Sequence, residues 1–291
     1  MSFDRNIPFL SKTLAWRLFK RHHTHFNHSY WAYRAAARYA FTSTKSHSSE
    51  EQANVLFDLS SNPTRLADTL GTWAKNFSNF NEWTQLASVI AICGYLETYI
   101  AQIATAALES RPALIFGGTD QVDGTTLLKA GNKYDFYDHV EPLIRGDWQS
   151  RISAYARLFG SCPFEHELTR LEQVRNLRNN AGHTFGRDIK SMRFVESSLV
   201  QPLPKASEKK IQGFLGLADS VASKIEKHLG RTFVGSYEVI RLFHIWRGSI
   251  GGGSPLSQGM SKNFSQYFNS VTGNPYGRDD FIKLSKYYDA V

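Results

Sequence analysis

Apolar side chains recur along most of this chain at intervals of three and four residues, the spacing that places them on one face of an α-helix. The clearest stretch runs from Glu82 to Glu109 and contains no Pro and a single interior Gly. Between its two ends only Glu97 is charged. The spacing predicts a long helix whose apolar stripe consists of Leu86, Ile90, Cys93, Glu97, Ile100, Ala104 and Ala107.

The same spacing predicts further helices, separated by Gly, Pro and polar clusters. One or two helices are predicted over residues 1–45, and shorter helices are expected near residues 50–59 and 64–77. After a less regular stretch over 111–140, helices are predicted over 147–159, from 164 through the region of His183, over 207–229 and over 237–247. Gly230 is expected to end the helix that precedes it. The pattern predicts an all-α helical bundle.

Charge is unevenly distributed along the chain. The net charge is +8, and residues 1–45 hold eight Lys or Arg and a single acid, so the remaining residues carry only +1. Aromatic and His side chains are interleaved with these cations, a composition that suits single-stranded nucleic acid. The alternative is an amphipathic helix that packs its aromatics on the rest of the protein. We expect a basic, aromatic-rich helical extension over 1–45, a helical domain over 50–230 and a C-terminal appendage over 231–291.

The appendage is itself aromatic and basic at intervals. It either docks a partner subunit or packs back on the N-terminal segment.

Composition gives little reason to expect a cofactor or a membrane. Cys93 and Cys162 lack metal-site spacing, and no acid or cysteine accompanies the histidines between His22 and His28. We therefore expect no metal and no cofactor. No apolar run is expected to approach the roughly 18 residues of a membrane-spanning helix, and the N-terminus lacks a signal-peptide core. These features predict a cytoplasmic protein.

The stretch most suggestive of chemistry is LRNNAGH, which ends at His183. A neutral His183 can take the proton of a ribose 2′-hydroxyl or protonate the leaving 5′-oxygen. Arg178 can hold the phosphate in a bidentate fork, and the amide of Asn179 can orient either partner. Together these roles describe RNA cleavage without a metal.

The arrangement Arg178-Asn179-x-x-x-His183 resembles the signature of the HEPN domains. Residues 94–99 (GYLETY) and 158–160 (LFG) also resemble the family, so the resemblance covers roughly residues 80–230. Many HEPN domains are all-helical, dimeric, metal-independent ribonucleases that act as toxins or against phage, and others are scaffolds or nucleotide-binding modules. The resemblance implies a HEPN-like bundle, a tRNA or mRNA substrate, and a partner subunit or antitoxin.

Helix geometry restricts how this motif can work. On a continuous helix, positions 178 and 183 point about 140° apart, whereas positions 179 and 183 share a face. Either Gly182 breaks the helix before His183, or a two-fold axis brings the arginine of one chain to the histidine of another. The resemblance favours the second device, because HEPN sites lie at a dimer seam.

Two further arginines flank the motif, and Arg175 and Arg187 can hold neighbouring phosphates of the RNA. The alternative for Arg175 is a surface residue paired with Glu172 or Gln173.

A carboxylate on an apolar stripe is costly unless a cation or several donors satisfy it. We expect Arg178 to be the partner of Glu97, which makes Glu97 a supporting residue of the site. The alternative is a glutamate that reaches a helix edge and water.

Two classes of function follow from these features. The first is a metal-independent endoribonuclease that leaves 2′,3′-cyclic phosphate ends, in which Arg178, Asn179 and His183 are catalytic. The second is a non-catalytic dimerising module that binds RNA or a nucleotide signal, or that serves as an interaction subunit of a defence complex.

Overall fold

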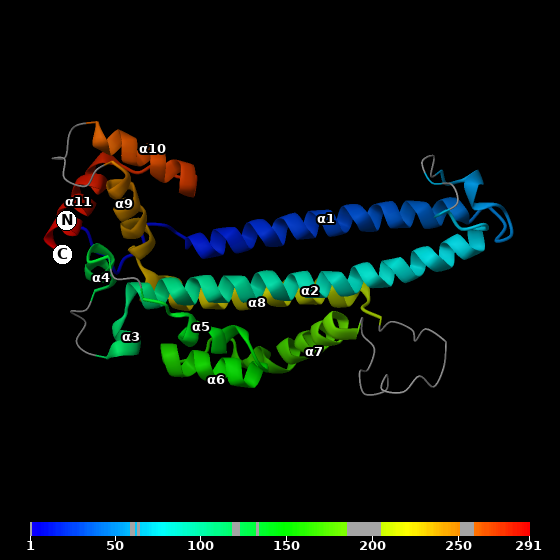
Figure 1. Ribbon diagram of the computed structural model, residues 1–291, viewed down its shortest axis with the longest axis horizontal. Helices are drawn as coiled ribbons and strands as arrows, with labels where there is room; N and C mark the ends of the chain where they lie inside the picture. Colours follow the sequence, from blue (N-terminus) through cyan, green and yellow to red (C-terminus); the bar gives the residue numbers. More distant parts are fainter. Residues whose placement is uncertain are drawn as a thin grey trace. The chain divides into compact units, whose positions relative to one another are not determined.

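The computed structural model describes residues 2–58, 62, 65–117, 123–131, 134–184, 205–250 and 259–291, apart from the side chains of His183 and Thr184. These residues form eleven α-helices and no strand (Figure 1). Extended backbone pairs only at one isolated bridge, between Gln52 and Thr69. The predicted all-α class is therefore confirmed.

The helices differ widely in length. The longer ones are α1 (Leu14–Thr44), α2 (Leu70–Ser110), α6 (Trp148–Phe159), α7 (Leu168–Thr184), α8 (Glu208–Ile225), α9 (Tyr237–Ser249), α10 (Met260–Thr272) and α11 (Arg278–Ala290). The shorter ones are α3 (Ala113–Phe116), α4 (Gly124–Lys129) and α5 (Tyr137–Ile144). Short 3-10 turns occur at η1 (Ala53–Val55) and η3 (Glu165–Glu167), and η4 (Glu226–Val234) is a π-helix.

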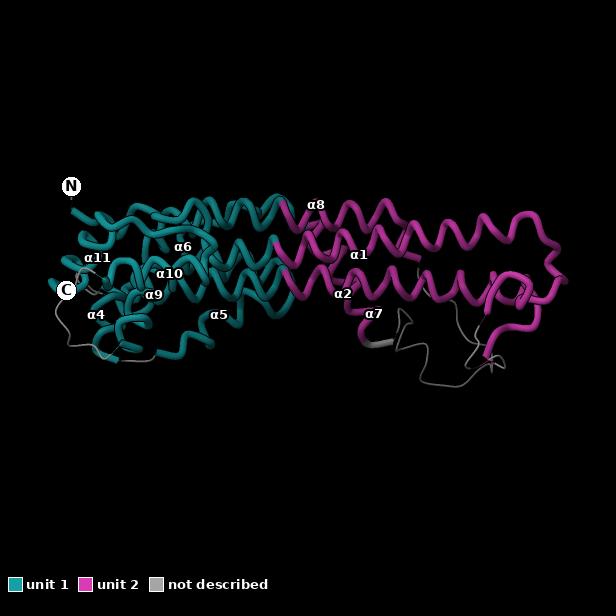
Figure 2. The backbone as a smooth tube through the Cα atoms, turned by 90° about the horizontal axis from the view of Figure 1, so that it is seen from above, with its two compact units in different colours: residues 1–20, 96–168, 220–291 teal, residues 21–95, 169–219 magenta. Residues whose placement is uncertain are grey.

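Contacts divide the chain into two compact units (Figure 2). Unit 1 consists of residues 1–20, 96–168 and 220–291, and unit 2 of residues 21–95 and 169–219. Helices α1, α2 and α8 each contribute residues to both units. The three segments expected from the sequence, 1–45, 50–230 and 231–291, were defined by composition, whereas the two units are defined by contacts. The three-segment division stays a prediction.

In unit 1 the C-terminal helices form an aromatic core with the N-terminal segment. Helices α9, α10 and α11 bury Phe243, Phe264, Phe268 and Tyr288 together with Leu10. The ring of Phe9 lies 4.5 Å from that of Tyr276 and 5.9 Å from that of Phe268, centroid to centroid. Of the two alternatives for the appendage, the structure therefore shows packing on the N-terminal segment.

Two carboxylates hold the first turn of α1. Glu226 accepts hydrogen bonds from the backbone N–H of Thr13 (2.8 Å) and from its hydroxyl (2.7 Å), and Glu238 accepts one from the N–H of Leu14 (2.8 Å). The first N–H groups of a helix have no partner inside the helix, and side-chain oxygens can accept hydrogen bonds from them. These side chains therefore anchor α1 although its own first turn contains no acid.

The predicted end of a helix at Gly230 is wrong, because the chain continues through it as the π-helix η4 to Val234. Gly230 is instead a point of close packing, since a Cβ there would lie 3.2 Å from the methyl group of Thr13. The chain turns at Gly235, whose φ is +56°. A left-handed φ favours glycine, so this residue supplies the stop signal.

Helix α2 begins at Leu70 and runs through the gap expected between the helices at 64–77 and 82–109. No Pro or Gly occupies positions 78–81 to stop it. The helix predicted near 50–59 is only the short turn η1.

The buried face of α2 is also shifted by one residue in its first half. Val89, Ile92 and Leu96 are buried there, whereas Ile90 of the predicted stripe is 40% exposed. Apolar side chains lie on nearly every face of this helix, so spacing alone does not select the buried one.

By length and composition, α2 is the one described helix that could cross a membrane. An 18-residue window in it has a mean hydropathy of 1.5, and 44% of that window is buried inside the structure. The expectation that no apolar run approaches a spanning length is therefore wrong. A core helix of a soluble protein passes the same test.

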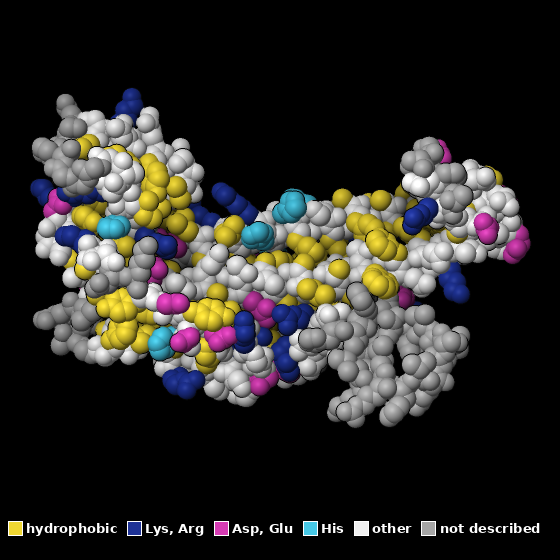
Figure 3. Space-filling view, viewed as in Figure 1, with side chains coloured by type: hydrophobic (Ala, Val, Ile, Leu, Met, Phe, Trp, Pro, Cys, Tyr) yellow, Lys and Arg dark blue, Asp and Glu magenta, His cyan; other side chains and the backbone are white. Residues whose placement is uncertain are grey.

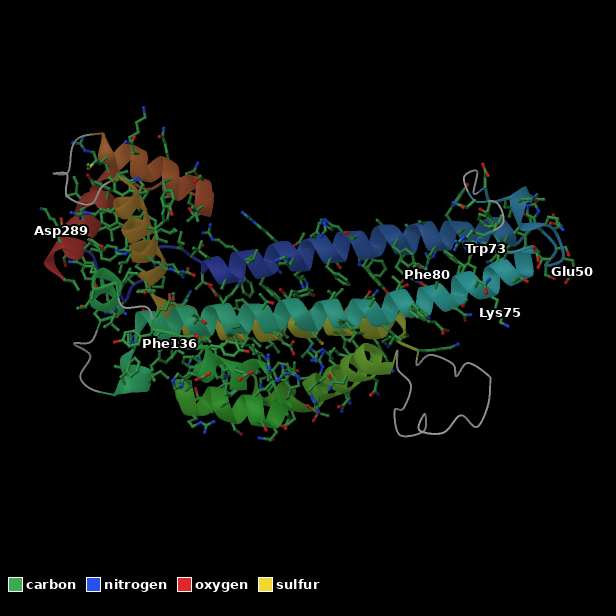
Figure 4. The ribbon with its side chains drawn as sticks, in the orientation of Figure 1. Glu50, Trp73, Lys75, Phe80, Phe136 and Asp289 are labelled. Carbon is green, nitrogen blue, oxygen red and sulfur yellow. The ribbon has the colours of Figure 1, made fainter. Side chains whose placement is uncertain are left out.

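In unit 2, aromatic side chains of α1 pack on α2. Phe41 contacts Trp73 and Phe77 through ring edges, and Trp73, labelled in Figure 4, stacks with Phe77 and with Phe57 at centroid distances of 4.8 and 4.0 Å. His23 also forms a hydrogen bond of 3.1 Å with the hydroxyl of Tyr95. These contacts agree with the amphipathic alternative for the extension.

Candidate functional site

Helix α7 carries the motif. Leu171, Val174 and Ala181 are buried and form an apolar stripe on this helix. The helix runs through Gly182 without a break and includes the backbone of His183 and Thr184. A break at Gly182 is therefore not how this chain arranges the motif, because the glycine takes an ordinary helical conformation.

Arg178 and Asn179 contact each other directly. The Nη1 atom of Arg178 donates a hydrogen bond of 3.0 Å to Oδ1 of Asn179, and both side chains are half-buried. Of the two roles expected for the asparagine, this contact favours orientation of the arginine.

His183 lies in the last turn of α7, and its side chain is outside the described part of the structure. Arg187 lies outside the described residues altogether. Because α7 is continuous, positions 178 and 183 diverge by about 140° around its axis. The two-fold arrangement of chains that would join Arg178 and His183 at one phosphate stays a prediction.

Arg175 forms an ion pair with Glu172 on the same helix. Its Nε lies 2.9 Å from Oε1 and 3.0 Å from Oε2 of that glutamate, and its Nη2 also binds Oε1. This is the alternative weighed for Arg175 from the sequence. Its role in holding a neighbouring phosphate stays a prediction.

The structure gives Glu97 a partner that the sequence analysis missed. The Nη1 atom of Arg151 donates a hydrogen bond of 2.9 Å to Oε1 of Glu97. The Arg151 side chain is only 4% exposed, and its Nε donates to the carbonyl of Gly146 at 3.1 Å. Its guanidinium lies over the ring of Trp148, 4.7 Å from the centroid.

A signal for this pair was present in the sequence. Arg151 lies on the buried face of α6 that also carries Ile152, Tyr155 and Phe159. Arg151 is a cation on the apolar stripe of α6, and Glu97 is a carboxylate on the apolar stripe of α2. The expected partner, Arg178, belongs to unit 2 whereas Glu97 belongs to unit 1, so that pairing stays a prediction.

Neither cysteine is part of a disulfide, and Cys162 is buried. Burial raises the pKa of the Cys162 thiol to about 11, so it is not a reactive nucleophile at neutral pH. Within the described ranges, no group of three or more His, Cys, Asp or Glu side chains could hold a metal ion. In comparisons with known proteins, no family model, curated protein or solved structure matches this chain.

Proposed function

We propose that this protein is a metal-independent endoribonuclease of the HEPN type. The observation that carries the proposal is the hydrogen bond between Arg178 and Asn179 on a continuous helix that also contains His183. These are the groups that cleavage by a ribose hydroxyl needs: a proton carrier, a phosphate-binding cation and an amide that fixes the cation.

In this mechanism His183 accepts the proton of the 2′-hydroxyl, or donates the proton that the leaving 5′-oxygen requires. The 2′-oxygen attacks the adjacent phosphorus as the bond to the 5′-oxygen breaks. Arg178 neutralises the charge that builds on the phosphoryl oxygens, and Asn179 holds the guanidinium in place. The products carry a 2′,3′-cyclic phosphate and a 5′-hydroxyl.

The active species in this proposal is a homodimer with composite sites. The continuity of α7 supports it, because one straight helix directs positions 178 and 183 to different sides. By the HEPN resemblance, the substrate is tRNA or mRNA, and the setting is a cytoplasmic toxin or anti-phage effector that a partner subunit or antitoxin restrains. Arg175 and Arg187 are proposed to hold flanking phosphates, and Glu97 to support the fold around the site.

The test is induced expression of the wild type beside Arg178→Ala and His183→Ala, followed by growth and by the integrity of total RNA. Arg170→Ala is the matched control, because it removes a cation from the same helix outside the motif. Wild type and control should arrest growth and leave RNA with cyclic-phosphate ends, whereas the motif variants should leave RNA intact.

Purified wild-type protein should cleave RNA in the presence of EDTA and leave DNA intact. A requirement for added Mg²⁺, or cleavage of DNA, contradicts the mechanism. Equal behaviour of all variants with intact RNA would favour the dimerising binding module instead.

A further inference from the structure

Unit 1 contains a cavity of about 480 Å³ that involves none of the motif residues. It lies where the C-terminal end of α2, helix α4, the segment before α5 and helix α9 meet. Small-molecule sites commonly have volumes of about 300–1,000 Å³, with a mostly apolar lining and a few convergent polar groups. The lining of this cavity fits that description.

Gly124 fixes one side of the cavity. A Cβ at this position would lie 1.9 Å from the carbonyl oxygen of Glu109, so only glycine allows α4 to approach the end of α2 so closely. Asp123 caps α4 by accepting a hydrogen bond of 2.8 Å from the N–H of Thr125. As a result, Leu127 and Leu128 form an apolar wall beside Glu109.

The polar groups of the cavity have unused hydrogen-bonding capacity. Tyr237 is only 3% exposed, and its hydroxyl makes no hydrogen bond with any described residue. Burial raises the pKa of this hydroxyl, which therefore stays a donor at neutral pH. The hydroxyl can therefore donate a hydrogen bond to a ligand in the cavity.

Glu109 forms an ion pair with an arginine on α9. Its Oε2 is 3.4 Å from Nη1 of Arg241, while Oε1 accepts no hydrogen bond from the described part of the chain. His244 uses Nδ1 in a hydrogen bond of 2.6 Å with the hydroxyl of Tyr288, which leaves Nε2 for another partner. Burial lowers the pKa of His244, so its ring is neutral at pH 7.

Aromatic rings form the remaining wall. Tyr134 and Phe136 line the cavity with centroids 6.2 Å apart, and Phe116 lies 5.1 Å from Tyr134. Tyr134 is 45% exposed, so part of its side chain is accessible to a ligand. Figure 3 shows hydrophobic side chains gathered near α3 and α4, and Figure 4 labels Phe136 near the end of α2. Exposed aromatic rings of this kind stack on planar ligands.

We infer that this cavity binds a guanine base. Guanine presents two adjacent N–H donors on its pairing edge, and a carboxylate such as Glu109 accepts both. Tyr237 can donate to the guanine carbonyl oxygen, and Tyr134 supplies the stacking surface. Arg241 is half exposed at the rim, where it can meet the phosphate. Adenine lacks these two adjacent donors. On its pairing edge a ring nitrogen, which is a hydrogen-bond acceptor, would face the carboxylate instead.

The base can belong to a free guanine nucleotide or to a residue of an RNA strand, since both present the same edge. The inference goes beyond the ribonuclease proposal and does not depend on it, because no motif residue lines the cavity.

The experiment is isothermal titration of the full chain with GMP and with AMP. GMP should bind, and AMP should bind at least about tenfold more weakly, the range of a lost charge-assisted hydrogen bond. Glu109→Gln should weaken GMP binding by about tenfold or more, and Tyr237→Phe severalfold. Glu141→Gln is the matched control, because that carboxylate pairs with Arg145 on the surface of α5 and should leave GMP binding unchanged.

Thermal melting of each variant checks folding, and Tyr237→Phe removes one hydroxyl while it keeps the ring. Arg178→Ala should bind GMP like the wild type, which separates this site from the proposed catalytic one. The absence of GMP binding at millimolar concentration, equal affinity for AMP, or full affinity in Glu109→Gln would overturn the inference.

The two sources of the base are distinguished with a short 2′-O-methyl RNA that contains one guanine, which the proposed mechanism cannot cleave. Guanine-dependent binding of this strand, with displacement by GMP, identifies an RNA residue. Binding of GMP alone identifies a free nucleotide. Either result supports a guanine site.

Discussion

Replacing Glu97 with alanine should destabilise unit 1, because it leaves the guanidinium of Arg151 buried without its carboxylate. Among the described residues, Arg151 donates hydrogen bonds to two groups, Oε1 of Glu97 and the carbonyl of Gly146. The ring of Trp148 covers its guanidinium. Water cannot readily replace the carboxylate in these surroundings.

The two ends of this ion pair differ in exposure, and that difference sets the expected magnitudes. Arg151 is 4% exposed and Glu97 is 19% exposed. Loss of the acid from such a buried pair costs about 3–5 kcal/mol. Glu97→Gln keeps an acceptor oxygen and should cost less, about 1.5–3 kcal/mol, the range for a hydrogen bond to a charged group.

The assay is urea denaturation followed by circular dichroism, with the slope of the transition checked for each variant. Glu141→Ala is the control, because its pair with Arg145 is exposed and should contribute less than about 1 kcal/mol. If Glu97→Ala is no less stable than this control, Arg151 does not depend on the carboxylate and the argument fails.

Three further predictions concern stability, and each is measured by the urea midpoint. Burial raises the pKa of Glu238 from 4.5 to about 7, so the fold favours the neutral carboxyl. The stability that this pKa shift contributes is present below pH 4.5 and is lost as the pH rises through 7. Glu238→Gln should remove this decline in stability. A variant with the same pH profile as the wild type would contradict the prediction. Gly235→Ala should cost about 2 kcal/mol or more, since φ is +56° and a Cβ would lie 2.3 Å from the carbonyl of Arg5; wild-type stability would show that the turn relaxes freely. Asp147→Ala should cost about 1 kcal/mol by removing the cap on the N–H of Ser150, and no change would mean that water replaces it.

Local signals in the sequence predicted the elements that local chemistry controls. The helix predicted over 147–159 is α6, with Asp147 as its N-cap and Gly160 at a φ of +86° as its stop. Both residues act within one turn of the helix end, so the sequence alone reveals them.

Features that depend on tertiary packing were harder to predict. The continuity of α2 through positions 78–81 and the role of Gly230 depend on neighbours that are distant in sequence. The apolar residues of α2 lie on several faces, so periodicity placed the buried stripe one residue off in the first half of the helix, whereas Ile100, Ala104 and Ala107 of the predicted stripe are buried.

The candidate sites differ in the same way. Arg178 and Asn179 are adjacent in a short motif, so the sequence was enough to propose that they act together. The partner of Glu97 lies 54 residues away. The cavity joins Glu109 to Tyr237 and His244, with no local pattern that connects them.

The measurement that tests the proposed function most directly is RNA cleavage by an equimolar mixture of Arg178→Ala and His183→Ala, refolded together, beside each variant alone. Each variant alone should be inactive. In the mixture, half of the dimers carry one intact Arg178–His183 pair, so activity should recover to about a quarter of the wild-type level. Cleavage at the wild-type rate by either variant alone would contradict the catalytic assignment, and a mixture that stays inactive would contradict the composite site.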